Sequence, residues 1–188
     1  MKQLTIAAAL ALCALSSQAQ SPSIASAANP NYVEVGFTAV KYEEDALGYS
    51  IKTSPDAIRG ILGREINSNV AVEAMFATGL GRSSVEANGQ DLSGANFKIN
   101  SMYGLYVTPK TMLADNIEGF VRLGYAYARG TASYNGDSVS DSDNGFSYGI
   151  GARYHFDKTT FLNVDYMSYL NKSDYKAEGF TVGLGFRF

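Results

Sequence analysis

The sequence predicts an all-β protein, an eight-stranded antiparallel up-and-down transmembrane β-barrel. Three observations favour this fold class. First, eight segments of about ten residues alternate apolar side chains with small or polar ones, as strands with two different faces do. Second, the connections between these segments are alternately short and long. Third, 13 tyrosines and 10 phenylalanines stand beside only 4 prolines, and aromatic residues favour strands.

The amino-terminal segment, residues 1–19, is interpreted as a secretory signal peptide. Lys2 provides a positive start, and residues 6–15 form a short apolar run. Ser17 and Ala19 place small residues at the two positions that a signal peptidase recognises. We therefore expect export and cleavage after Ala19.

The single cysteine, Cys13, lies inside this segment. A lipoprotein would use Cys13 as its lipidated residue, but Leu12 before it is bulky where such sites carry small residues. Cleavage would leave a mature chain without disulfide or thiol chemistry. Residues 20–30 are expected to form a flexible leader, and residues 31–188 a single barrel domain.

The first four strands are expected at residues 32–42, 57–66, 70–79 and 97–108. Their alternation predicts outward apolar faces that carry Val33, Val35 and Phe37, then Ile58, Leu62 and Ile66, then Val72, Ala74 and Phe76, then Ile99, Tyr103 and Leu105. The opposite faces point inward. They carry Glu34, then Arg59 and Glu65, then Glu73, then Lys98 and Asn100.

The last four strands are expected at residues 117–128, 146–157, 161–170 and 179–188. Their outward faces are expected to carry Val121, Leu123 and Tyr125, then Tyr148, Ile150 and Tyr154, then Leu162, Val164 and Tyr166, then Phe180, Val182, Leu184, Phe186 and Phe188. Glu118, Arg122, Arg153, His155, Asp165 and Arg187 are expected to point inward. A soluble lipocalin-like barrel or sandwich is disfavoured because the polar faces are rich in Gly and Ala, which suits a cramped interior better than a hydrated surface.

Short connections are expected at residues 67–69, 109–116 and 158–160, on the periplasmic side with both termini. Longer polar loops are expected on the external side, at residues 43–54, 80–96, 129–145 and 171–177.

The inward residues predict an interior network of balanced charges. An eight-stranded barrel has an interior that side chains can fill, so opposite charges are expected to pair there rather than conduct ions. Glu34 is expected near Arg187 across the seam between the first and last strands, and Asp165 near Arg153. The proposed network consists of Glu34, Arg59, Glu65, Glu73, Lys98, Glu118, Arg122, Arg153, Asp165 and Arg187.

Other functional classes find little support in the sequence. The net charge is only -3 and no basic cluster suggests nucleic acid. His155 is the only histidine and is expected in the core hydrogen-bond network near the periplasmic end. Residues 141–145 hint at calcium, but an EF-hand would need an acid where Ala152 stands. No catalytic, metal-binding or cofactor-binding residues are predicted.

Three segments carry a family resemblance: GFVRLGYAYAR from Gly119, GFSYGIGARYHF from Gly145 and FLNVDYMSY from Phe161. They resemble strands of small eight-stranded bacterial outer-membrane barrels, namely the OmpA transmembrane domain and the OmpX/Ail group. The resemblance covers about residues 31–188, without the peptidoglycan-binding domain of two-domain OmpA proteins. It implies a location in the outer membrane of a Gram-negative envelope and a structural or surface-interaction role through the external loops.

The resemblance also implies partners. Members of this family typically end in phenylalanine, so the last strand, with its outward residues Phe180 to Phe188, is expected to be read by the barrel-assembly machinery. Outer-membrane lipid and lipopolysaccharide would surround the barrel, and host surfaces or phage would meet its loops. Two alternatives remain open: a narrow porin-like channel for ions or small solutes, and a lipid A-modifying enzyme. The enzyme is disfavoured because such barrels need a histidine near the external rim.

Overall fold

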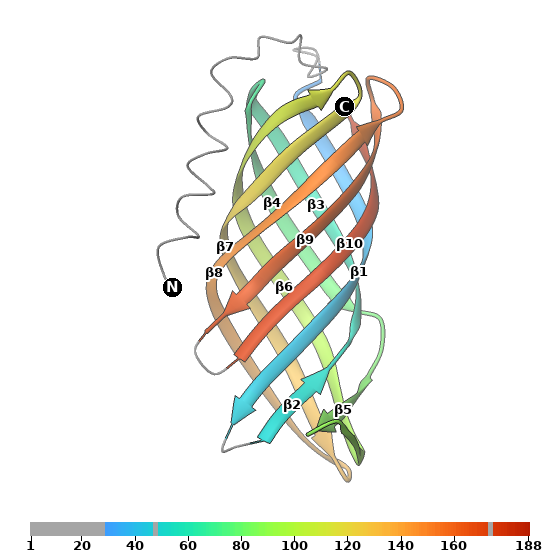
Figure 1. The fold of residues 1–188 in the computed structure, drawn as a ribbon, viewed down its shortest axis with the longest axis vertical. Helices are drawn as coiled ribbons and strands as arrows, with labels where there is room; N and C mark the ends of the chain where they lie inside the picture. The colour runs from blue at the N-terminus through green and yellow to red at the C-terminus, as the bar shows by residue number, and fades with distance from the viewer. Residues whose placement is uncertain (1–28, 47–48, 173–174) are drawn as a thin grey trace.

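Ten strands form one antiparallel sheet that closes on itself, in a computed structural model that describes residues 29–46, 49–172 and 175–188 (Figure 1). The expected signal peptide, its cleavage site and all but the last two leader residues lie outside this range. No helix among the described residues has the length and apolar character needed to cross a membrane. The strands are β1 (Asn31–Ala46), β2 (Tyr49–Thr53), β3 (Asp56–Asn67), β4 (Val70–Gly79), β5 (Ser83–Ala87), β6 (Gln90–Ala114), β7 (Ile117–Tyr134), β8 (Asp137–His155), β9 (Thr160–Asn171) and β10 (Tyr175–Arg187).

Eight of these strands make the ring, in the order β10, β9, β8, β7, β6, β4, β3, β1. Pairing of β1 with β10, from Tyr32 opposite Arg187 to Glu44 opposite Tyr175, closes it. All pairings are between antiparallel strands, and the ring strands are neighbours in the chain apart from the interruptions at β2 and β5. The predicted eight-stranded up-and-down barrel is confirmed.

The two ends of the barrel differ. At the terminal end, where Asn31 and Phe188 are hydrogen-bonded, the turns after β3, β6 and β8 are short. The turn after β8 is held by Asp157, whose carboxylate accepts hydrogen bonds from the Thr159 hydroxyl and from the amides of Thr159 and Thr160. These hydrogen bonds hold the pKa of Asp157 below its ordinary value, and the bond from the Thr159 hydroxyl contributes most.

At the far end, the segments predicted as long loops are mostly strand. β7 and β8 continue to a two-residue turn at Asn135 and Gly136, and β5 and β6 to one at Asn88 and Gly89. All four turn residues have positive φ, as the tight turn of a β-hairpin requires. β2 and β5 pair with each other between β1 and β6, so the wall continues beyond the ends of β3 and β4 (Figure 1).

The connection predicted at residues 109–116 is also wrong in extent. β6 runs through Pro109 to Ala114, and only Asp115 and Asn116 form the turn. Pro109 lies opposite Val70, where β4 begins, and the amide of Lys110 donates to the Asn69 carbonyl. The proline therefore sits near a strand end, where the loss of one amide donor is tolerated.

The closure seam is narrow where Gly36 of β1 lies opposite Gly183 of β10. A Cβ on Gly183 would stand 2.7 Å from the Val35 carbonyl oxygen and 2.8 Å from the Gly36 Cα. Both contacts are with backbone, which cannot move aside as a flexible side chain could. The seam therefore requires glycine at this position.

Gly183→Val is predicted to lower the free energy of unfolding by about 1–3 kcal/mol, because the new side chain would separate β1 from β10. The measurement is urea unfolding of the refolded barrel, with heat-modifiable mobility on a gel as a second readout. Gly60→Val is the control, since the nearest atoms to a Cβ there are 3.9 Å away. Equal stability of the two variants would show that the seam does not need glycine.

Candidate functional site: the charged interior and the outer wall

The interior at the terminal half of the barrel holds a dense group of charged side chains. The exposed fractions of these side chains are at most 5%. The predicted residues found inside are Glu34, Arg59, Glu65, Glu73, Glu118, Arg122, Arg153, Asp165 and Arg187.

Lys98 was predicted to belong to this group and does not: it is exposed, and its neighbour Ile99 points inward instead. The cause is a β-bulge in β6, where the register with β7 shifts between Ile99 and Ser101. A bulge adds one residue to one strand and so exchanges the inward and outward faces beyond it. The alternation read back from Tyr103 therefore gives the wrong face for Lys98 and Ile99.

The deeper part of the network joins two arginines to three carboxylates. Arg59 lies 2.5 Å from an Asp165 oxygen and 3.0 Å from a Glu34 oxygen. Arg122 contacts the same two acids, at 2.8 and 3.2 Å, and also Glu73 at 2.5 Å. Each guanidinium thus serves several carboxylates, which is how buried charge is tolerated.

The part nearest the terminal end is centred on Lys110, which lies in the segment predicted as a connection. Its ammonium lies 2.5 Å from Glu65 and 3.0 Å from Glu118. Arg187 also pairs with Glu65, and its second amino group lies 3.9 Å from Glu118. Lys110 takes the place in the charge balance that Lys98 was expected to fill.

Arg153 links the two parts. Its guanidinium group lies 2.7 Å from Glu73 in the deeper part and 3.0 Å from Glu118 in the part nearest the terminal end. Its guanidinium carbon also stands 4.6 Å from the centre of the Phe120 ring and 4.7 Å from that of Tyr32. The Tyr32 hydroxyl donates to Glu73, so the aromatic residues complete the network. Five cations and five anions are joined: Arg59, Lys110, Arg122, Arg153 and Arg187 with Glu34, Glu65, Glu73, Glu118 and Asp165.

The two specific pairs predicted from the sequence are wrong, although all four residues do point inward. Glu34 lies opposite Gly185 rather than Arg187, and it pairs with arginines from β3, β7 and β8. Asp165 lies opposite Gly151, and it pairs with Arg59 and Arg122 rather than Arg153. Long side chains reach across the lumen, so the partners are not the neighbours in the sheet.

His155 is inward and buried near the terminal end, as expected, but it is not part of a hydrogen-bond network. Among the described residues neither ring nitrogen has a hydrogen-bond partner. The nearest carboxylate oxygen, of Glu118, is 3.9 Å away. The ring packs against Phe161 with a centroid distance of 5.7 Å. His155 is therefore mainly a packing residue.

The other half of the interior is filled by apolar and hydroxyl side chains. Tyr106 and Ser147 share a hydrogen bond of 3.1 Å, and Thr38 and Thr181 one of 2.9 Å. Nearer the far end the Tyr42 ring stacks between Phe97 and Tyr175, at centroid distances of 5.6 and 5.9 Å. The buried apolar residues on the far-end side of the charges are Val40, Ala57, Met75, Ala77, Ile99, Met102, Tyr106, Met167 and Tyr169.

The outer wall is apolar and exposed, the reverse of a soluble protein. The closing strand shows this fully, since Phe180, Val182, Leu184, Phe186 and Phe188 are each 44 to 58% exposed. Aromatic rings lie side by side on neighbouring strands, with Tyr103 packed between Phe76 and Tyr127. An apolar outer band with aromatic residues is the arrangement of a barrel in a lipid bilayer.

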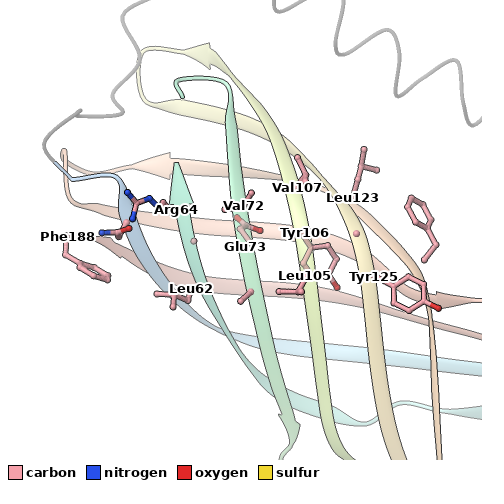
Figure 2. A pocket seen from close by; sticks show the side chains of 15 residues that line it. Leu62, Arg64, Val72, Glu73, Leu105, Tyr106, Val107, Leu123, Tyr125 and Phe188 are labelled. Carbon is pink, nitrogen blue, oxygen red and sulfur yellow. The ribbon is translucent and has the colours of Figure 1, made fainter. Parts of the chain in front are cut away.

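A groove of about 980 Å³ crosses this outer wall. Figure 2 shows Arg64 and Phe188 together at one end, with Leu62, Leu105 and Tyr125 along it. The groove therefore opens toward the surroundings of the barrel.

The far end carries exposed ion pairs on β1, β2 and β8. Glu43 lies 2.9 Å from Lys41 and 3.3 Å from Lys52. The hydrogen bond from Lys41 contributes most to lowering the pKa of Glu43, and the one from Lys52 contributes next. Lys172 pairs with Asp143 at 2.6 Å. No group of His, Cys, Asp and Glu suited to a metal ion occurs among the described residues.

Comparisons with known proteins agree with this geometry. The outer membrane protein beta-barrel domain family matches residues 5–188. No curated protein matches the sequence significantly. Among solved structures, Ail of Yersinia pestis in complex with the heparin analogue sucrose octasulfate shares 19% identity, covering 84% of this chain and 97% of Ail, with a TM-score of 0.61.

Two further barrels are similar to this chain. Neisserial surface protein A shares 16% identity over 85% of this chain and 97% of its own, with a TM-score of 0.64. OprG from Pseudomonas aeruginosa shares 14% identity over 85% of this chain and 96% of its own, with a TM-score of 0.60. At such low identities, the structural similarity shows a shared fold alone. Together with the family match over nearly the whole sequence, this shared fold shows that the chain is a small integral barrel of the bacterial outer membrane and belongs to the outer membrane protein beta-barrel domain family.

Proposed function

We propose that this barrel is a structural and surface-interacting protein of the envelope, with a lumen closed by its own side chains. The single observation that carries the proposal is the interior network of equal and opposite charges. Every charged group in it contacts at least one opposite charge, and the Phe120 ring lies against the guanidinium groups of Arg122 and Arg153. The far half of the interior, filled by apolar and hydroxyl side chains, adds a second barrier, because ions do not enter a tightly packed, mainly apolar interior without large cost.

Arg122→Ala is predicted to lower the free energy of unfolding by about 3–5 kcal/mol, since it leaves Glu73, Glu34 and Asp165 buried with too little positive charge. Urea unfolding in detergent or vesicles measures this. Arg129→Ala, on the exposed part of the same strand, is the control and is expected to change stability by less than about 0.5 kcal/mol. A small effect of Arg122→Ala would mean that the network does not support the fold.

The proposed orientation puts the terminal end in the periplasm and the far end outside the cell. It is supported by the short turns at the terminal end and the projecting β5–β6 and β7–β8 hairpins at the other, as outer-membrane barrels have them.

A protease site inserted between Asn135 and Gly136 is predicted to be cut in intact cells, because this turn would lie outside. The same site between Lys158 and Thr159 should be cut only after the outer membrane is opened. Western blotting against a terminal tag reads out both. The opposite order of cleavage would reverse the orientation.

The external contacts are proposed to be with cationic or cation-bridged surfaces, lipopolysaccharide among them. The charges inside the barrel cancel. At the terminal end, the two acids Asp115 and Asp157 balance the two bases Arg64 and Lys158. Among the described side chains, the acidic excess therefore lies at the far end, where Glu43, Glu44, Asp56, Glu86, Asp91, Asp137, Asp141, Asp143 and Glu178 outnumber Lys41, Lys52, Arg82, Lys98, Arg129, Lys172 and Lys176. The Ail structure contains a heparin analogue, a polyanion. Such a ligand does not suit the acidic far end of this chain.

The outward residues of β10 and Phe188 are proposed as the signal for the barrel-assembly machinery. Phe188→Asp is predicted to reduce the folded, heat-modifiable fraction in the outer membrane several-fold. Phe156→Asp is the matched control, since Phe156 is an outward aromatic of similar exposure, 58% against 52%, at the same end. Equal losses in both variants would indicate a general requirement for apolar residues at this boundary rather than a signal.

The two alternatives have weaker support. A narrow channel would need a continuous polar path, and the described interior changes from ionic to apolar along its length. A lipid A-modifying enzyme would need a histidine near the external rim. The only histidine, His155, is buried at the opposite end. We therefore propose a role without catalysis or cofactor.

A further inference from the structure

The groove on the outer wall arises from one small residue in a row of large ones. Strand pairing puts Leu62, Ala74, Leu105, Tyr125 and Phe146 side by side on β3, β4, β6, β7 and β8. The four large members of this row are 57 to 70% exposed, so their side chains stand out from the wall. The alanine between the two leucines forms the floor of the groove.

One end of the groove is polar. Arg64 points outward near the end of β3, directly opposite Asn31 of β1, and both residues line the groove. Phe188 lines the same end of it, near Arg64 (Figure 2). Arg64 is exposed and forms no ion pair with any described residue, whereas the arginines inside the barrel are all paired. It is thus an unpaired cation at the border of an apolar band.

We propose that this groove binds a single anionic phospholipid, with its phosphate on Arg64 and Asn31 and its acyl chains along Ala74 between Leu62 and Leu105. An arginine fork matches the geometry of a phosphate and is stable at the level of the lipid head groups. The apolar remainder of the groove matches hydrocarbon. In the orientation proposed above, on which the choice of leaflet rests, Arg64 lies at the periplasmic boundary, so the ligand is a phospholipid of the inner leaflet.

The simplest competing explanation is that any lipid fills the groove, as it fills every hollow of a membrane protein. The two explanations differ in selectivity. A general solvent shell would contain each lipid at its bulk proportion. A site built on Arg64 would enrich anionic lipid locally, about fivefold for one arginine near the membrane surface.

The absence of tryptophan from the sequence makes a direct test available. The whole barrel carrying Leu105→Trp is folded into vesicles of zwitterionic phospholipid that contain a few per cent of an anionic phospholipid with brominated acyl chains. Bromine quenches tryptophan on contact. Leu184→Trp, at an outward position of β10 with 58% exposure and away from the groove, reports the bulk lipid.

Quenching at position 105 is expected to correspond to about fivefold more brominated anionic lipid than at position 184. In the Leu105→Trp background, Arg64→Gln should remove this excess and Arg64→Lys should keep part of it. Arg129→Gln, an exposed arginine near the far end, should leave it unchanged. Ala74→Phe, which fills the floor, should remove the excess although Arg64 is present.

Equal quenching at the two positions, or an excess that survives Arg64→Gln, would overturn the proposal. So would an equal excess with a brominated zwitterionic lipid, because it would show filling without recognition of charge. Heat-modifiable mobility verifies that each variant is folded. The variants at Arg64 and Ala74 lie on the outer wall, away from the interior network and the external hairpins. Failure of the proposed lipid site therefore leaves the proposed function standing.

Discussion

The structure depends on the narrowness of a closed eight-stranded ring. Such a ring leaves room for side chains and little else, so each charged group inside must be satisfied by another side chain. Five cations and five anions meet this requirement in one connected network, with Arg153 joining its two parts. Removing one member would leave the others buried and unbalanced, which makes the network a condition of the fold rather than an addition to it.

The same constraint explains how the remaining residues are distributed. Because the interior accepts a neutral set of charges, the net charge is carried by the far end, where acidic residues exceed basic ones. Because the wall faces lipid, its outward positions are mostly apolar, and Ala74, the one small residue in the row from Leu62 to Phe146, leaves a groove that Arg64 also lines. Interior, wall and external hairpins thus follow from one architecture, and each offers a different kind of contact.

Much of this could be predicted from the sequence, because the period-two alternation survives in nearly every strand. It gave the fold class, the eight ring strands and the inward position of most charged residues. It failed where the alternation is interrupted: the bulge in β6 exchanges the faces at Lys98 and Ile99, and Pro109 concealed that the strand continues to Lys110. The Asn-Gly pairs at residues 88–89 and 135–136 are typical of two-residue hairpin turns, so these two turns could have been predicted in place of long loops. The choice of partners within the lumen could not be predicted, because Glu34 reaches arginines on strands that are distant in the sequence.

The central claim is that the interior network is a structural plug, and single-channel recording tests it most directly. Purified wild-type barrel inserted in a planar bilayer is expected to show little or no steady conductance, because the described lumen is closed first by paired charges and then by an apolar layer. Large, steady currents whose ion selectivity is changed by Arg122→Ala, with no loss of stability, would contradict the account and identify the barrel as a channel.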